Sequence, residues 1–169
     1  MDLSILENLF NSDEQIRKKS ELVLSDLAEK DFKEYLTILC NVLANEGVHL
    51  KLRKMATTLI KNPIAKIQKY SDIWKSFDEK YKDNIKQLIL ATLGSELSEI
   101  RKCGALIIAT IIKTELPLTE KWPSLLPLLC QSKFEKKEFH LAAIETLGYI
   151  CEEINKKDLS SNEIDTVLS

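Results

Sequence analysis

Apolar residues recur with the spacing of an α-helix along almost the whole chain. The clearest stripes lie in residues 32–43 and 85–93, where apolar side chains fall at i, i+3, i+4 and i+7. Asp31 and Asp83 precede these two stripes and are expected to cap the helices. Shorter stripes lie in residues 5–10 and 122–129. No stretch alternates between apolar and polar residues like a β-strand, so the sequence predicts an all-α protein.

A second kind of helix follows each of these first helices and starts with a common signature. The signature is an apolar residue, then Arg or His, then a small residue three positions later. It reads Ile16-Arg17 with Ser20, Leu52-Arg53 with Ala56, Ile100-Arg101 with Gly104, and Phe139-His140 with Ala143. The small residue would let this helix lie close to its partner. The period of roughly 40 residues is that of HEAT repeats, whose helical hairpins stack because one hairpin cannot bury its apolar face alone.

These repeats predict an α–α superhelix. We expect a right-handed solenoid of HEAT repeats with about four helical hairpins and the start of a fifth. Within a single solenoid of residues 1–169, the expected repeats are 2–30, 31–82, 83–117, 118–157 and a partial repeat at 158–169. Ser160 and Glu163 form a capping box that would begin the last helix.

Residues 61–82 depart from the regular repeat. Pro63 is expected to kink or end the second helix of repeat two, because proline lacks an N–H and its ring clashes with the preceding turn. The apolar residues from Ile64 to Phe77 still have helical spacing. We therefore expect a further helical segment or an ordered loop there, packed on the stack.

The composition agrees with a folded domain and argues against several classes of protein. The 169 residues include 24 Lys and Arg against 26 Asp and Glu, a formal net charge of −2 that disfavours direct binding of nucleic acid. No apolar run approaches the length of about 20 residues that spans a bilayer, so membrane insertion is not expected. The widely separated cysteines are interpreted as reduced core thiols. They are Cys40, Cys103, Cys130 and Cys151.

The chain offers no residues from which to argue catalysis. His49 and His140 are the only histidines, and neither has Cys, Asp or Ser residues placed as in a catalytic triad or a metal site. The sequence motifs of phosphate loops, dinucleotide-binding folds and zinc proteases are absent. We therefore expect a protein that is not an enzyme, with no catalytic residue, no cofactor and no metal ion.

Five segments carry a resemblance to a known family. They are Leu43-Ala44-Asn45, Ile60-Lys61-Asn62, Glu115-Leu116-Pro117, Trp122-Pro123-Ser124-Leu125-Leu126-Pro127 and Glu145-Thr146-Leu147-Gly148-Tyr149-Ile150-Cys151-Glu152. Together they resemble the N-terminal region of the importin-β family, the karyopherin-β nuclear transport receptors. The resemblance covers essentially the whole chain.

The resemblance implies a receptor that carries proteins into the nucleus through nuclear pores. In that family the N-terminal repeats bind GTP-loaded Ran on a concave side lined by the second helices. Importin-α or cargo, and Phe-Gly nucleoporins, would bind mostly to later parts of a full-length solenoid. The implied locations are the cytoplasm, the nucleus and the nuclear pore. Two alternatives stay open, namely another karyopherin such as an exportin and a HEAT scaffold unrelated to transport.

The candidate Ran contacts come from two sources. Lys61 and Asn62 match the family's motif at the end of the second helix of repeat two. The other candidates are inferred from helix geometry, because they occupy positions of the second helices outside the core stripe. They are Lys54, Thr58, Lys18 and Lys102.

A few residues are expected to have structural roles instead. Trp122 is expected to anchor the start of its helix against the core. Gly148 lies inside a helix, where glycine is unfavourable, so a close helix–helix approach beside Tyr149 is expected there. Leu22 and Leu106 fall on outward positions of the second helices and are expected to pack against the next repeat.

Overall fold

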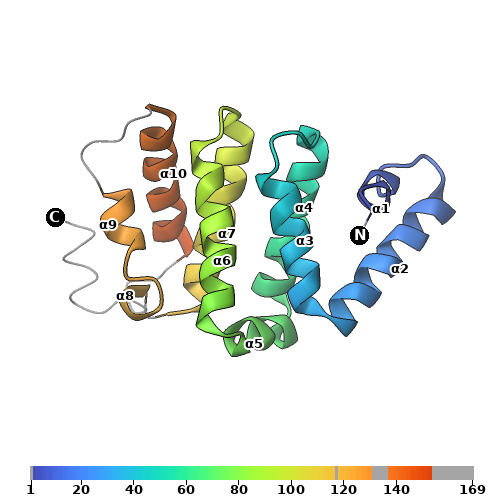
Figure 1. Cartoon of the computed structure of the whole chain (residues 1–169), viewed down its shortest axis with the longest axis horizontal. Helices are drawn as coiled ribbons and strands as arrows, with labels where there is room; N and C mark the ends of the chain where they lie inside the picture. The colour runs from blue at the N-terminus through green and yellow to red at the C-terminus, as the bar shows by residue number, and fades with distance from the viewer. Residues whose placement is uncertain (1, 117, 131–136, 154–169) are drawn as a thin grey trace.

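The computed structural model describes residues 2–116, 118–130 and 137–153, which form α-helices joined by short turns (Figure 1). The paired helices are α1 (Ser4–Asn8) with α2 (Glu14–Lys30), α3 (Phe32–Ala44) with α4 (Leu50–Lys66), α6 (Glu79–Ala91) with α7 (Ser98–Thr114), and α9 (Leu125–Leu129) with α10 (Lys137–Glu153). The connecting elements are α5 (Gln68–Ser76), the 3₁₀-helix η1 (Thr92–Gly94) and α8 (Leu118–Lys121). The expected capping box and partial repeat at the C-terminal end lie outside the described residues.

The hairpins stack in two layers. The second helices α4, α7 and α10 pack side by side, and the first helices α3 and α6 pack against each other in the other layer (Figure 1). Helix α2 packs against α1 and α3 and runs obliquely to the other helices. The predicted all-α HEAT solenoid is thereby confirmed for the described part of the chain.

One predicted helix start is correct and the other is wrong. The Asp31 carboxylate accepts the Glu34 backbone N–H at 2.9 Å at the start of α3, as expected of an N-cap. Helix α6 begins before Asp83, with Asp78 as its cap accepting the Tyr81 N–H at 2.8 Å. An N-cap needs an extended backbone, which Asp78 has at φ −62° and ψ 147°. Asp83 instead lies inside the helix.

Helix α4 continues through Pro63 to Lys66. Of the two effects expected of this proline, a kink or the end of the helix, the second is therefore wrong. Proline cannot donate to the carbonyl four residues earlier, which is that of Leu59. The Tyr35 hydroxyl of α3 donates to this carbonyl at 3.0 Å and supplies the missing partner. The further helical segment expected between Ile64 and Phe77 is present as α5.

Because the Tyr35 hydroxyl replaces the N–H that Pro63 lacks, the effects of mutating Tyr35 and Pro63 on the unfolding free energy should depend on each other. Tyr35→Phe is expected to lower the unfolding free energy by about 1–2 kcal/mol, because the Leu59 carbonyl loses its partner. In a Pro63→Ala background the restored N–H can reach that carbonyl, so the same change should cost about 1 kcal/mol less. Urea denaturation of the four proteins measures the cycle, and additive effects would rule out the shared carbonyl.

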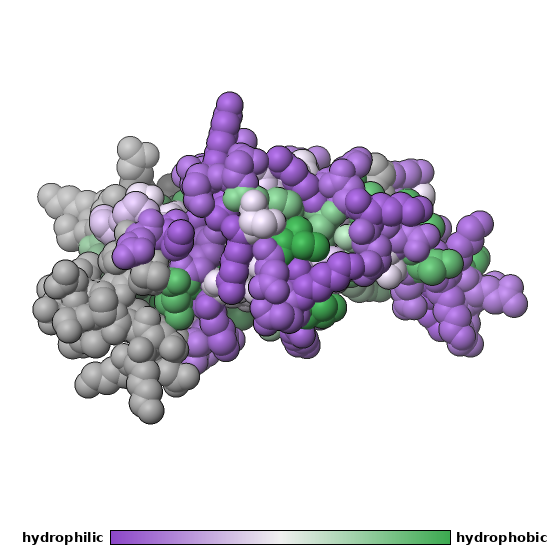
Figure 2. All heavy atoms as spheres, turned by 90° about the horizontal axis from the view of Figure 1, so that it is seen from below, coloured by the Kyte–Doolittle hydropathy of each residue, from purple (hydrophilic) through white to green (hydrophobic). Residues whose placement is uncertain are grey.

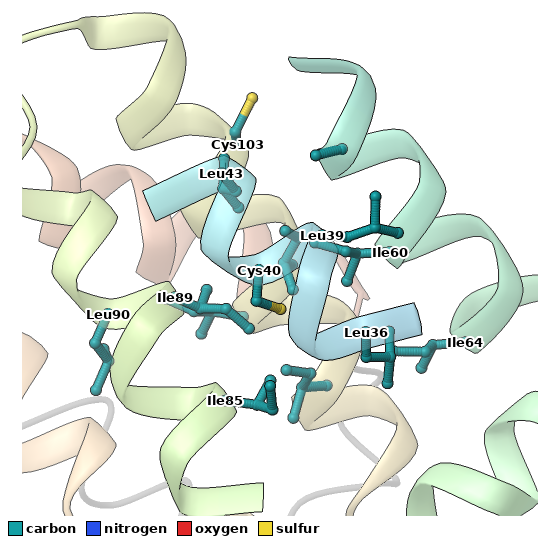
Figure 3. Close-up of a cluster of buried hydrophobic side chains, with 14 of the residues drawn as sticks. Leu36, Leu39, Cys40, Leu43, Ile60, Ile64, Ile85, Ile89, Leu90 and Cys103 are labelled. Atoms are coloured by element: carbon teal, nitrogen blue, oxygen red, sulfur yellow. The ribbon is translucent and has the colours of Figure 1, made fainter. Parts of the chain in front are cut away.

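The core lies between the two layers of helices. Figure 3 shows Leu36, Leu39 and Cys40 of α3 among apolar side chains of α4 and α6. Cys40 and Cys103 are buried, as predicted, and burial raises the pKa of the Cys40 thiol to about 12. Cys130 and Cys151 are exposed, so their assignment to the core is wrong. In both helices the buried apolar positions end one residue before the cysteine. Cys130 is the C-cap of α9 and follows the buried Leu129, and Cys151 follows the buried Ile150 in the last turn of α10.

The signature positions explain how each hairpin closes. All four small residues are buried, namely Ser20, Ala56, Gly104 and Ala143. Arg17 and Arg101 each donate from Nη1 to two successive carbonyls of the turn before their helix, at 2.6 to 2.9 Å. Arg53, 1% exposed, donates from Nε to the Leu43 carbonyl at 2.8 Å. The arginine therefore pairs carbonyls at the hairpin turn that the helices leave without partners.

Candidate partner-binding surface

The candidate residues of α4 follow one side of the helix. Lys54, Thr58 and Lys61 are separated by four and three positions, which places them on one face. Lys54 and Thr58 are exposed, whereas Lys61 and Asn62 are half-buried. Asn62 lies inside the helix, because α4 extends to Lys66.

The repeat brings two lysines of neighbouring helices together. Lys54 and Lys102 follow the signature arginines of α4 and α7, and both lie close enough to Glu99 to influence its ionisation. The pKa of the Glu99 carboxyl is lowered by hydrogen bonds from its own backbone and from Ser98, and these two lysines lower it further. Because α4 and α7 stack side by side, Lys54, Glu99 and Lys102 form one exposed charged surface.

Lys18 occupies the same signature position on α2 but has different surroundings. Its Nζ forms an exposed ion pair with Glu14 of the same helix at 2.6 Å. Helix α2 is oblique to α4 and packs on α1 and α3 (Figure 1). Leu22 on the same helix is 62% exposed, so the packing expected for it is absent, while Leu106 of α7 is half-buried. The structure therefore does not bring Lys18 into the surface formed by Lys54 and Lys102.

Two cavities lie at opposite ends of α4. One, of about 400 Å³, is lined by Lys54 and Thr58 together with Phe10, Leu50 and Met55. The second, of about 440 Å³, is lined by Lys61 and by the ends of α4 and α7. The position of Phe10 beside α4 could not be predicted from the sequence, because its spacing assigns it to the core stripe of the first helix.

The residues expected to have structural roles differ in their surroundings. Trp122 is 5% exposed beside the start of α9, and the Lys86 Nζ lies 5.1 Å from its ring centroid. Tyr149 packs partly buried against the core. Gly148 is exposed, and among the described residues nothing lies within 4 Å of a Cβ built on it. The close helix–helix approach expected at Gly148 is therefore wrong.

The open surroundings of Gly148 predict the effect of adding a side chain. Gly148→Ala is expected to raise the unfolding free energy by about 1 kcal/mol, because alanine loses less backbone entropy in a helix and meets no neighbour. Thermal unfolding, with Glu145→Ala on the same helix as a near-neutral control, measures the gain. A lower melting temperature for Gly148→Ala would show that the site is crowded.

Neither a cluster of metal-ligating side chains nor a membrane-spanning helix is found among the described residues. No group of three or more His, Cys, Asp or Glu side chains among them could hold a metal. None of their helices combines the length and apolar character that crossing a bilayer requires.

The chain is similar to known proteins along almost its whole length. The sequence profile of the Importin-beta N-terminal domain matches residues 20–95. Importin subunit beta-1 of Schizosaccharomyces pombe is 31% identical over 96% of this chain, and that of Arabidopsis thaliana is 30% identical over 98%. The chain belongs to the importin-β family. It spans about a fifth of the length of these relatives, each of which it covers to 20%.

Solved structures of importin-β proteins have the same fold. One describes Kap95p binding that induces the switch loops of RanGDP to adopt the GTP-bound conformation. It matches 98% of this chain at a TM-score of 0.84 and 28% identity, over 20% of its own length. The Kap95:Nup1 complex matches 98% of this chain at a TM-score of 0.85 and 27% identity, also over 20% of its length.

Some of the candidate residues lie inside the segment matched by the importin-β family profile, and others lie outside it. The segment matched by the family profile, residues 20–95, contains Lys54, Thr58, Lys61 and Asn62. Lys18 and Lys102 lie outside it. Lys102 is nevertheless adjacent to Lys54 around Glu99, whereas Lys18 is not joined to them by any described contact. Lys54 and Lys102 are therefore the two candidates that the structure brings together, around Glu99.

Proposed function

We propose that this chain is the N-terminal part of a nuclear import receptor, a single HEAT solenoid over residues 1–169 that binds GTP-loaded Ran. The observation that carries the proposal is its match, along 98% of its length, to Kap95p in a structure where Kap95p drives the Ran switch loops into the GTP-bound conformation. The contact surface is the outward side of α4 and α7 around Lys54 and Lys102, extended by Thr58, Lys61 and Asn62 along α4.

The action is binding and conformational change, without catalysis. Each hairpin contacts only its neighbours, so small rotations between hairpins add up to a change in curvature along a solenoid. Ran bound here would favour curvatures that hold cargo poorly. The linkage is reciprocal: the factor by which Ran weakens cargo binding is the factor by which cargo weakens Ran binding.

The remaining partners belong to a longer receptor. Importin-α or cargo would bind later repeats, as would the Phe-Gly nucleoporins, and the structural likeness to Kap95 in its Nup1 complex supports a nucleoporin-binding receptor. Such a receptor would move between cytoplasm and nucleus through nuclear pores.

The test is the affinity of this chain for Ran loaded with a non-hydrolysable GTP analogue and, separately, with GDP. We expect the GTP form to bind at least about ten-fold more tightly, a difference of roughly 1.4 kcal/mol. Equal or absent binding by a folded chain would contradict the proposal and favour a scaffold unrelated to transport. Tighter Ran binding in the presence of cargo, measured on a longer chain, would instead favour an exportin.

A further inference from the structure

A continuous groove follows the edge of the solenoid where α4 and α7 end. The cavity of about 440 Å³ beside Lys61 and a second cavity of about 310 Å³ both have Lys75 and Thr114 in their walls. The groove therefore runs from the end of α4, past α5 and the end of α7, to α8. This edge faces the viewer in Figure 2, where hydrophilic side chains surround a smaller apolar area.

The charge of this groove differs from that of the chain. Its walls contain Lys61, Lys66, Lys75, Lys82, Lys113 and Lys121. The carboxylates in the walls are those of Glu115 and Glu153. The whole chain has a net charge of −2, so this basic groove is a local concentration of positive charge.

The carboxylates of the groove are already occupied. Glu153 pairs with Lys113 at 2.8 Å, and Glu115 pairs with Lys82 at 3.4 Å. Of the other wall lysines, none has a carboxylate within 4 Å among the described residues. They are Lys61, Lys66, Lys75 and Lys121. An anion in the groove would reduce the repulsion among these lysines and gain charge-assisted hydrogen bonds.

The groove also has apolar surface between the lysines. Ile67, which joins α4 to α5, is 47% exposed, and Leu116 is half-buried in the second cavity. A ligand with carboxylates alone would leave this surface in water. A peptide that alternates acidic and apolar side chains would match both features.

We propose that this basic groove docks an acidic peptide segment of a protein partner, with its carboxylates on Lys66, Lys75 and Lys121 and an apolar side chain on Ile67. A peptide fits better than nucleic acid, since the net charge of −2 repels a long polyanion and Ile67 offers no partner to a phosphate. The site goes beyond the Ran surface around Lys54 and Lys102, neither of which lines it. Lys61 borders both surfaces and stays unchanged in the test.

The test is fluorescence anisotropy with a short fluorescein-labelled peptide rich in glutamate and containing two leucines. We expect binding that weakens with added salt and falls at least about ten-fold in Lys66→Glu/Lys75→Glu. The matched control is Lys19→Glu/Lys137→Glu, which makes the same charge change at exposed lysines of α2 and α10 and should lose less than about two-fold. Circular dichroism confirms that both variants are folded.

Three results would overturn the proposal. They are absence of peptide binding to the wild-type chain, equal losses in the groove variant and its control, and tighter binding of an oligothymidylate of equal charge. Binding of GTP-loaded Ran is measured in parallel on all three proteins. The groove proposal predicts that Ran binds the groove variant and the control alike, so failure of the groove and failure of the Ran surface give different results.

Discussion

Glu115→Gln is expected to lower the unfolding free energy by about 3–5 kcal/mol, because it leaves the buried Lys86 ammonium without its carboxylate and leaves Lys82 with Glu79 alone. Glu115 is 6% exposed and lies 2.7 Å from the Lys86 Nζ and 3.4 Å from the Lys82 Nζ. The two lysines are 1% and 3% exposed. Charges this deeply buried depend on one another, since water cannot replace a lost partner.

The charged cluster holds three parts of the fold together. Lys86 also donates to the Lys121 carbonyl at 2.9 Å, and so links α6 to α8 as well as to the end of α7. Burial lowers the pKa of Lys82, but Glu79 and Glu115 together outweigh burial and leave the pKa raised, so Lys82 stays charged in the folded state. Loss of Glu115 would therefore loosen the whole edge at which these helices meet.

Urea denaturation measures the unfolding free energy and so tests this prediction. A second ion pair of the same chain supplies a matched control. Glu153→Gln removes the carboxylate of an ion pair with Lys113 at 2.8 Å whose two side chains are about half exposed. That change should cost less than about 1 kcal/mol. Similar small losses in both variants would show that the Glu115 cluster is solvated and contributes little.

Gly104→Leu is expected to lower the unfolding free energy by about 3 kcal/mol through overpacking. A Cβ built on Gly104 lies 2.0 Å from the Thr92 Oγ1 and 3.4 Å from the Ile89 carbonyl oxygen. The Thr92 hydroxyl donates to that carbonyl at 2.5 Å, so rotating it away would break a buried hydrogen bond. The helix α7 would therefore have to move away from η1.

If overpacking against Thr92 causes the loss of stability, a second substitution at Thr92 should restore it, and Gly148 offers a matched control. Gly104→Ala adds only the Cβ, and Thr92→Ala in the same chain removes the oxygen that it meets, so the double variant should recover most of the loss from Gly104→Ala. Gly148→Leu places the same side chain on an exposed helical glycine and should change stability by less than about 1 kcal/mol. Equal effects of leucine at the two glycines would contradict the close approach at Gly104.

The sequence predicted the repeat because its signals are local. The helical spacing and the signature of apolar residue, arginine and small residue each lie within one helix, so they could be recognised without the fold. The equivalence of Lys54 and Lys102 followed from the same signature, and their approach to Glu99 follows from the stacking of α4 on α7. Lys18 has the same place in the signature and a different setting, because α2 is oblique to the stack.

The features that the sequence missed depend on contacts between distant segments. Helix α4 passes through Pro63 because a hydroxyl of α3 reaches the carbonyl that proline leaves unpaired. Gly148 lies inside a helix as Gly104 does, but no described residue lies within 4 Å of a Cβ built on it. The ion pairs that Lys82 and Lys86 form with Glu115 join residues that lie far apart in the sequence. The order of residues along a single helix does not show which residues of distant segments will come into contact.

The most direct test of Ran recognition is calorimetric titration of Ran, loaded with a non-hydrolysable GTP analogue, into the wild-type chain and into Lys54→Glu/Lys102→Glu. If the outward side of α4 and α7 is the contact surface, the double variant should bind at least about ten-fold more weakly while Lys19→Glu/Lys137→Glu binds like the wild type. Equal affinity of all three folded proteins would contradict the assignment of Ran binding to this surface.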